Sequence, residues 1–304
     1  MQRSGKHDPY PGGEIGNGED PPAPPEAPPR LKRAALILHC GGRAVAGTRG
    51  GIVIFSDNII TAHTDLMYVR LTASFRFSHD EITYLSPFFQ NGPRRNNVSY
   101  RLLNRRGSIA SDDGRRIRDD DIDVAEGVTV LDGPNTLAEV RAFFNRVRSE
   151  LHDQVFVYIH GHGNAERRFD GRLVLADETN APSEFASFAD VAMWINAIQA
   201  NHIGVAVDTC YSGQLARRIQ NRRHLLVAMS TGPQDLSLGD GENGYHKVRR
   251  GKFGDWSDLF IFNFTAEGED DKVDVATDRA SKAIGTESLN LSPRRAPRVL
   301  TGRH

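Results

Sequence analysis

The sequence has little cysteine and no long apolar segment. Its two cysteines, Cys40 and Cys210, are too few for a disulfide framework, and their use fits a reducing compartment, so we expect a cytoplasmic protein. No apolar run approaches the roughly 18 residues that a membrane span needs. The first residues, MQRSGKHDPYPGG, lack the apolar core of a secretory signal. We therefore expect no membrane partner.

An excess of charge of one sign is also lacking. The chain has 38 Lys and Arg against 39 Asp and Glu, which gives a formal net charge of −1. Nucleic-acid binding is driven by neutralisation of phosphates, so we expect no nucleic-acid partner. With 25% charged and 38% hydrophobic residues, the composition is that of a soluble globular protein with polar tails.

Three parts of different composition divide the chain. Residues 1–30 contain PPAPPEAPP and few large apolar residues, so we expect a disordered, proline-rich N-terminal tail. Residues 269–304 form a charged C-terminal segment. Residues 31–268 lie between them and carry the apolar patterns of one domain, because a single core of this size is more economical than two.

Strand and helix patterns alternate through residues 31–268. Apolar runs typical of buried strands lie at 34–39, 81–86, 155–160, 202–208 and 224–230, with a short hairpin strand at 172–177. Helices are predicted at 56–74, 136–151 and 187–201, and from about Ser212. This alternation predicts an α/β three-layer sandwich, with a mostly parallel central sheet and helices on both faces. Residues 259–264 fit a strand and a helix equally well.

One segment interrupts the alternation. Residues 91–127 show no convincing periodicity, so we expect a long loop, which carries eight arginines and then a run of aspartates. The aspartate run superficially resembles a calcium loop. It lacks the Gly and Glu that such a loop needs at its sixth and twelfth positions, which are Val124 and Val130 here. We expect no calcium site in it.

Reactive residues follow two of the predicted strands. His160-Gly161-His162-Gly163 ends one strand, and Asp208-Thr209-Cys210-Tyr211-Ser212-Gly213 ends another. Because the carboxyl ends of adjacent parallel strands meet at one edge of a sheet, we expect His162 and Cys210 to lie close together. A neighbouring imidazole and a helix N-terminus both lower the pKa of a thiol and so favour the nucleophilic thiolate. The backbone amides of Gly163 and Cys210 are candidates for an oxyanion hole.

Other interpretations of these residue types have less support. A buried cysteine is usually a small hydrophobic residue, which is what we expect of Cys40. His160 and His162 could form a metal-binding pair, but no nearby Cys, His or Asp completes a zinc coordination sphere. We therefore expect no metal and no other cofactor.

The two motifs resemble those of a known family. VFVYIHGHG and VAVDTCYSGQL are similar to the His-Gly and Cys motifs of the caspase/legumain clan of cysteine proteases, including its metacaspase branch. The resemblance extends over roughly 31–265, with AALILHCGG as a first strand and GDW at 254–256 similar to a legumain segment. It implies a caspase-like fold and a cysteine endopeptidase that forms a thioester acyl-enzyme. Cys210 is then the nucleophile, and His162, the histidine directly followed by glycine, is the general acid/base. His160 replaces a family Ser or Thr and is expected to lie behind the reacting groups.

The resemblance also implies substrate-binding residues. Asp208 falls where family members place a residue lining the S1 pocket, and Asp255 matches a legumain S1 acid; the alternative for Asp255 is a surface ion pair. Two carboxylates favour a cationic P1 side chain, so we expect cleavage after Arg and then Lys. Legumains carry a histidine-supporting Asn after the first strand, where this chain has residues 39–43. If Arg43 enters the pocket and neutralises one acid, the preference shifts toward Asn or Asp.

The arginine-rich loop is a candidate site for activation by cleavage. If the enzyme cleaves after arginine, the arginine-rich loop is a site of self-processing or of cleavage by an upstream activating protease, at Arg95, Arg106 or Arg116. Such a zymogen would act on protein or peptide substrates, and the resemblance implies a role in proteolytic signalling or defence. The alternative is a non-catalytic interaction module on the same fold, whose proline-rich tail docks a partner.

Overall fold

The structure is a computed structural model of the whole chain. The residues it describes are 31–41, 48–49, 52–53, 57–89, 94–103, 122–165, 170–176, 183–220, 222, 225–231, 257, 260–261 and 298–301. All of them belong to one compact unit, Leu31–His304. Within these residues, no helix is both long and apolar enough to cross a membrane.

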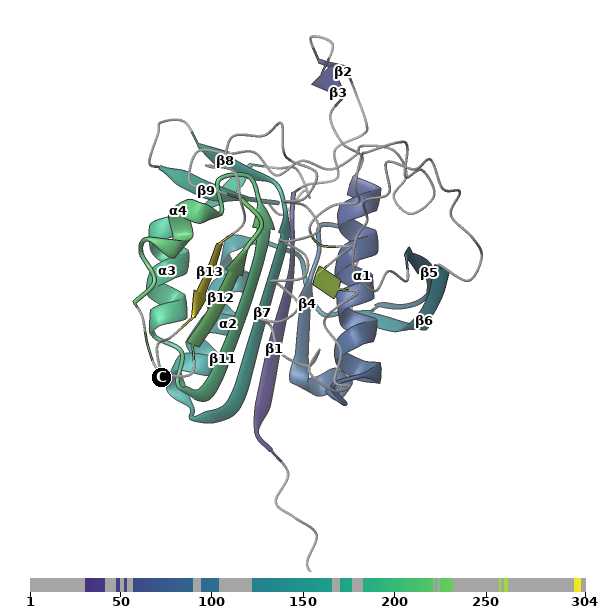
Figure 1. Cartoon of the computed structure of the whole chain (residues 1–304), viewed down its shortest axis with the longest axis horizontal. Helices are drawn as coiled ribbons and strands as arrows, with labels where there is room; N and C mark the ends of the chain where they lie inside the picture. Colours follow the sequence, from purple (N-terminus) through teal and green to yellow (C-terminus); the bar gives the residue numbers. More distant parts are fainter. Residues whose placement is uncertain are drawn as a thin grey trace, which may run out of the picture. The chain divides into compact units, whose positions relative to one another are not determined.

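A six-stranded sheet forms the centre of the domain (Figure 1). Its strands, in spatial order, are β13 (Arg298–Thr301), β12 (Leu225–Met229), β11 (Ala200–Thr209), β7 (His152–Gly161), β1 (Arg33–Cys40) and β4 (Ile82–Leu85). The strands from β12 to β4 are parallel, which confirms the predicted mostly parallel sheet. β13 is antiparallel to β12, so the charged C-terminal segment adds an edge strand that the sequence patterns did not indicate.

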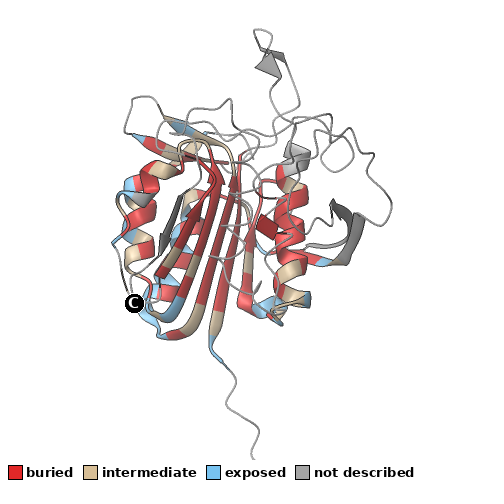
Figure 2. Ribbon diagram, viewed as in Figure 1, coloured by how far each residue is buried: buried red, intermediate tan, exposed pale blue. Residues whose placement is uncertain are grey.

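Helices cover both faces of this sheet, as predicted. α1 (Asp57–Ala73) packs on one face, where Leu66 and Met67 meet Ile37 and Tyr158. α2 (Leu137–Ser149), α3 (Phe188–Asn196) and α4 (Gly213–Ala216) pack on the other face. The central strands are buried along most of their length (Figure 2).

Helix α3 is shorter than the sequence predicts, and α4, for which only a start near Ser212 was expected, is a single turn. α3 begins as expected, with the Ser187 side chain accepting the Asp190 N–H, but it ends at Asn196, because β11 starts at Ala200. α4 has only four residues, so its dipole adds little to the electrostatics of the preceding turn. Phe260 and Ile261, in the segment that fitted both types, are helical and pack on the α1 face.

The prediction of a long loop over residues 91–127 is wrong for much of that range. β5 (Arg94–Leu103) and β6 (Ile122–Leu131) pair as an antiparallel two-stranded sheet. Alternating apolar residues at 98, 100 and 102 are the period-two signal that the many arginines obscured. Between these two strands, residues 104–121 of the arginine-rich segment lie outside the described residues.

The smaller elements lie outside the central sheet. β8 (Gly163–Ala165), β9 (Gly171–Leu175) and β10 (Glu184–Ser187) form a three-stranded antiparallel sheet in which β9 is the predicted hairpin strand. β2 (Thr48–Arg49) pairs with β3 (Ile52–Val53), and a 3₁₀ turn, η1 (His79–Glu81), precedes β4.

The topology indicates where a ligand would bind. The connection from β1 crosses the α1 face to β4, whereas the connection from β7 crosses the α3 face to β11. Adjacent parallel strands whose connections leave on opposite faces define a switch point, and ligands bind beyond the carboxyl ends of such strands. The two reactive motifs follow β7 and β11, at that edge.

Candidate active site

Gly161 ends β7 with a sharp change of direction. Its φ is +131°, a conformation open to glycine, and a Cβ at this position would collide with the Cys40 carbonyl oxygen. The backbone of His162 is then held on both sides. Its N–H donates to the Cys40 carbonyl at 2.9 Å, and its own carbonyl accepts the Val174 N–H at 3.0 Å. A half-buried His162 therefore rests on a rigid backbone.

The turn after β11 carries Cys210 and is strained at the next residue. Tyr211 has a φ of +64°, which costs a non-glycine residue about 1–2 kcal/mol. The turn is tied to the end of β12, because the Ser212 N–H donates to the Thr231 hydroxyl at 3.1 Å and the Thr231 N–H donates to the Ser212 hydroxyl at 3.2 Å. Strained backbone conformations that the surrounding hydrogen bonds hold in place are common at functional sites.

The two reactive segments lie against each other. In the ladder between β7 and β11, His160 is opposite Asp208 and Gly161 is opposite Thr209. Just beyond it, Gly163 lies so close to Cys210 that a Cβ on Gly163 would collide with the Cys210 carbonyl oxygen. The histidine and cysteine loops therefore meet at the rim of the sheet, beside the candidate oxyanion amides.

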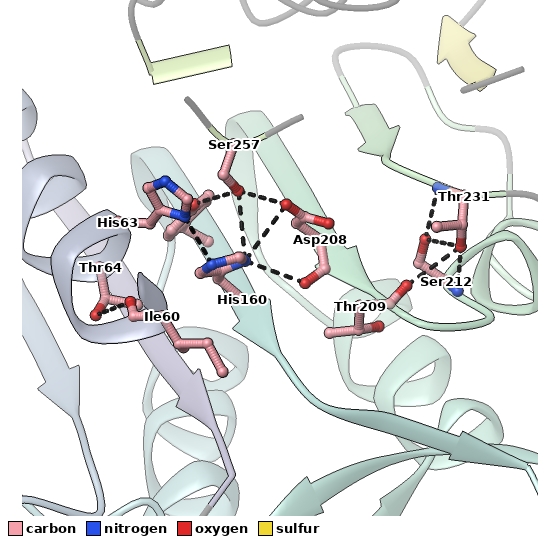
Figure 3. Close-up of polar contacts among 10 residues, drawn as sticks. Ile60, His63, Thr64, His160, Asp208, Thr209, Ser212, Thr231 and Ser257 are labelled. Carbon is pink, nitrogen blue, oxygen red and sulfur yellow. Dashed lines mark hydrogen bonds and ion pairs between the residues drawn. The ribbon is translucent and has the colours of Figure 1, made fainter. Parts of the chain in front are cut away.

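A buried polar network lies on the α1 face of the sheet below this rim (Figure 3). His160 is 6% exposed and Asp208 is 1% exposed. His160 Nδ1 lies 3.2 Å from the Asp208 carbonyl oxygen and 3.4 Å from its carboxylate, and His160 Nε2 lies 2.9 Å from Nδ1 of His63 on α1. The Ser257 hydroxyl donates to the Asp208 carboxylate at 2.7 Å and accepts the Tyr158 hydroxyl proton at 2.7 Å.

The contacting atoms assign the proton positions in this network. His160 Nδ1 faces only acceptors, namely the two Asp208 oxygens and the Ser257 hydroxyl, whose proton is already donated, so Nδ1 carries the hydrogen. Burial lowers the pKa of His160, and His63 lowers it further, against the opposing effect of Asp208. In the neutral ring Nε2 is an acceptor, and His63 Nδ1–H donates to it.

His39, at the end of β1, is buried on the same face, and its ring has no polar partner among the described residues. It is fully buried, its ring lies 5.6 Å from that of Phe88, and within the described part of the chain neither ring nitrogen has a hydrogen-bond partner. Burial lowers its pKa well below the ordinary value, and the imidazoles of His160 and His162 add to that effect. His39 is therefore a neutral residue within a cluster of histidines.

An asparagine from a distant part of the sequence holds the end of β1. The Asn135 side-chain amide donates to the His39 carbonyl at 2.6 Å and to the Gly41 carbonyl at 2.8 Å. Between these two carbonyls lies that of Cys40, which accepts the His162 N–H. Asn135 thereby stabilises the strand end on which the His162 backbone rests.

The predicted site residues fall into three groups in the structure. Gly163, directly after His162, lies against the Cys210 backbone at the rim, and Asp208 lies two residues before Cys210 with its carboxylate inside the buried network. Arg95 lies on β5 opposite Val130. Arg43, Asp255, Arg106 and Arg116 lie outside the described residues.

The two cysteines differ in environment. Neither forms a disulfide; Cys210 is half-buried, whereas Cys40 is fully buried in the core with α2 and α3. Burial raises the pKa of the Cys40 thiol well above its ordinary value, which keeps it protonated. Cys40 is thus a packing residue, as its sequence context suggested.

The sequence analysis missed four residues of this region. His63 lies on α1 within the continuous buried run 62–69, and a histidine inside a predicted helix was the available signal. For the other three, nothing in the neighbouring sequence indicates the contacts of Ser257 and Asn135 or the burial of the His39 ring. Among the described residues, no three His, Cys, Asp or Glu side chains are arranged to hold a metal ion.

Comparisons with known proteins give distant structural similarity only. No protein-family model matches the sequence, and no curated protein matches it either. The similar solved structures include protein GSU0716 from Geobacter sulfurreducens, at 11% identity over 89% of this chain and 93% of that one, with a TM-score of 0.43. They also include caspase-1 from Spodoptera frugiperda, at 12% identity over 90% of this chain and 88% of that one, with a TM-score of 0.45.

Proposed function

We propose that the chain is a cysteine endopeptidase in which Cys210 is the nucleophile and His162 the general acid/base. The observation that carries this proposal is the close approach of Gly163 to the Cys210 carbonyl, which brings the histidine loop and the cysteine loop together. The motifs that resemble the caspase/legumain clan occupy these same two loops. Such a site needs a thiol and an imidazole on rigid supports, which the backbone of each loop has.

The reaction would run in two stages. The Cys210 thiolate forms a bond to the carbonyl carbon of the scissile peptide, and the carbonyl electron pair moves to oxygen, beside the amides of Gly163 and Cys210. As this intermediate collapses, the C–N bond breaks and the His162 imidazolium gives its proton to the departing amine. His162 then takes a proton from water, which attacks the thioester, and Cys210 leaves as the thiolate.

Specificity for arginine, and then lysine, is part of the proposal. Asp255 and Asp208 would supply negative charge to a P1 pocket, with Asp255 as the bidentate partner of a guanidinium. An Arg43 side chain in that pocket would instead favour Asn or Asp at P1. The substrates would be proteins or peptides, in a signalling or defence cascade.

Activation by cleavage of the arginine-rich segment is also proposed, with a preferred position. Arg95 is paired within the β5–β6 ladder, so a protease could bind it in extended form only after this sheet opened. Arg106 and Arg116 lie between the two strands in the sequence. Self-processing, or cleavage by an upstream protease, is therefore proposed at Arg106 or Arg116.

A P1 peptide library tests the reaction and its specificity. Wild type should hydrolyse Arg and Lys substrates, Cys210→Ala should be inactive, and His162→Ala should lose about 10²–10⁴-fold in rate. His152→Gln, a buried histidine at the opposite end of β7, is the matched control and should retain activity. If wild type hydrolyses no Arg, Lys or Asn substrate, even after cleavage of the 104–121 segment, the chain is a non-catalytic interaction module.

A further inference from the structure

We propose that His160 is a positioning residue that joins the carboxyl ends of β7 and β11 and so sets the geometry of Cys210 and His162. This inference rests on the proposed function, because it concerns the same two reacting groups. The motif indicates only that His160 lies behind the reacting groups, and the inference adds what it does there. The argument depends on where its two ring nitrogens bind.

The Nδ1 side of His160 connects the two strand ends. His160 lies on β7 two positions before His162, and Asp208 lies on β11 two positions before Cys210. Nδ1 meets both the backbone carbonyl of Asp208, at 3.2 Å, and its carboxylate, at 3.4 Å. A single ring nitrogen therefore links the backbones that lead directly to the proposed acid/base and to the proposed nucleophile.

The Nε2 side of His160 fixes the orientation of the ring. His63, on α1, lies 2.9 Å from Nε2, so a rotation of the ring would break contacts on both sides. The Asp208 carboxylate is held in turn by the Ser257 hydroxyl at 2.7 Å. Because these groups are buried, water does not compete with their hydrogen bonds, which keeps the link rigid.

Two conservative substitutions separate the two sides of the ring. Asparagine places its side-chain NH₂ near the position of Nδ1 and can still donate to Asp208, whereas glutamine reaches the position of Nε2. If the link between the strands matters, His160→Asn should retain more activity than His160→Gln. His160→Leu, which removes both sides, should lose about 10²-fold in kcat with little change in KM, because small displacements of reacting groups cost this much.

A control on the same strand separates positioning from stability. His152, at the start of β7, is buried and contacts the Glu150 carbonyl through Nδ1 at 2.9 Å. His152→Leu removes a buried histidine from the same strand at the edge far from the site, so it should lower the melting temperature and leave kcat unchanged. If His160→Leu does not fold, the activities of His160→Asn and His160→Gln still show whether the Nδ1 link to Asp208 matters.

A second readout is independent of peptide hydrolysis. Iodoacetamide alkylation of intact protein followed over pH reports the Cys210 thiolate, because buried Cys40 should not react. In wild type, alkylation should reach half its maximal rate at a lower pH than in His162→Ala, and His160→Leu should behave like His162→Ala. The other ionisable groups around His160 are Asp208, His39, His63 and Tyr158, which the variant leaves in place.

The possible results distinguish this inference from the proposed function. Suppose that wild type hydrolyses no peptide, but its alkylation profile depends on His162 and His160→Leu abolishes that dependence. This result would refute the peptidase and support the positioning role of His160. An active wild type, with His160→Leu equal to it in kcat and alkylation profile, would support the peptidase and overturn the positioning. Equal losses in the Asn and Gln variants would also overturn it, and so would a wild-type alkylation profile that does not depend on His162.

Discussion

Replacing His39 by leucine should reduce the loss of stability that the fold suffers at acid pH. His39 is fully buried, and neither ring nitrogen has a hydrogen-bond partner among the described residues. Burial, and then the neighbouring His160 and His162, hold its pKa well below the ordinary value in the folded state. In the unfolded chain the same ring should titrate near pH 6.5.

The sign and size of the effect follow from this difference. As the pH falls below 6.5, the unfolded chain binds a proton at this residue that the folded protein does not bind, so the free energy of unfolding falls. Between pH 7.5 and pH 5.5 the loss through His39 should be about 1.4 kcal/mol. The pKa of His160 is lowered as well, which adds to the fall in the same direction.

Urea unfolding followed by circular dichroism at pH 7.5 and 5.5 measures this difference. His39→Leu should lose about 1.4 kcal/mol less than wild type between the two pH values. At pH 7.5 it should be at least as stable, because leucine has no unsatisfied polar atom to bury. Cys40→Ala, an adjacent buried substitution without a titrating group in this range, should lower stability equally at both pH values. Equal pH dependence in wild type and His39→Leu would contradict a neutral, buried His39.

Three further outcomes concern the rim. Gly163→Ala should lower kcat by about 10²-fold, because its Cβ would displace the Cys210 carbonyl, and peptide hydrolysis measures this; unchanged kcat would contradict the close approach. Asn135→Ala should lower the free energy of urea unfolding by about 1–3 kcal/mol, because the buried carbonyls of His39 and Gly41 lose their donor. Mass spectrometry after iodoacetamide treatment of the native protein should show one added group, at Cys210; modification of Cys40 would contradict its burial.

The central sheet was predictable because its strands are buried on both faces. Runs such as AALILH and VFVYIH are apolar up to a final histidine, which is typical of parallel strands between two helical layers. β13 was not predictable, since a four-residue strand at a sheet edge has no periodicity of its own and depends on its partner β12. The β5–β6 pair was predictable in principle from its alternation, but its charge pointed to a loop.

Of the candidate site, only the two motifs that follow β7 and β11 were predictable from the sequence. The residues after β7 and β11 were expected to meet, because topology alone brings the carboxyl ends of adjacent parallel strands together. The buried network combines His63, His160, Asp208 and Ser257, which are far apart in the sequence. Their contacts depend on how α1 and Ser257 are placed against the sheet, and no local pattern encodes that placement.

The position of Asp208 constrains how the proposed specificity could arise. One of its carboxylate oxygens already accepts the Ser257 hydroxyl proton and faces His160, so a bidentate contact with a substrate guanidinium would break a buried hydrogen bond to a charged group. Such a bond is worth about 1.5–3 kcal/mol. A charge buried in a medium of low dielectric still acts over several ångströms. Asp208 would therefore favour a cation at P1 through its field, whereas the choice of arginine over lysine, which needs two parallel hydrogen bonds, would fall to Asp255.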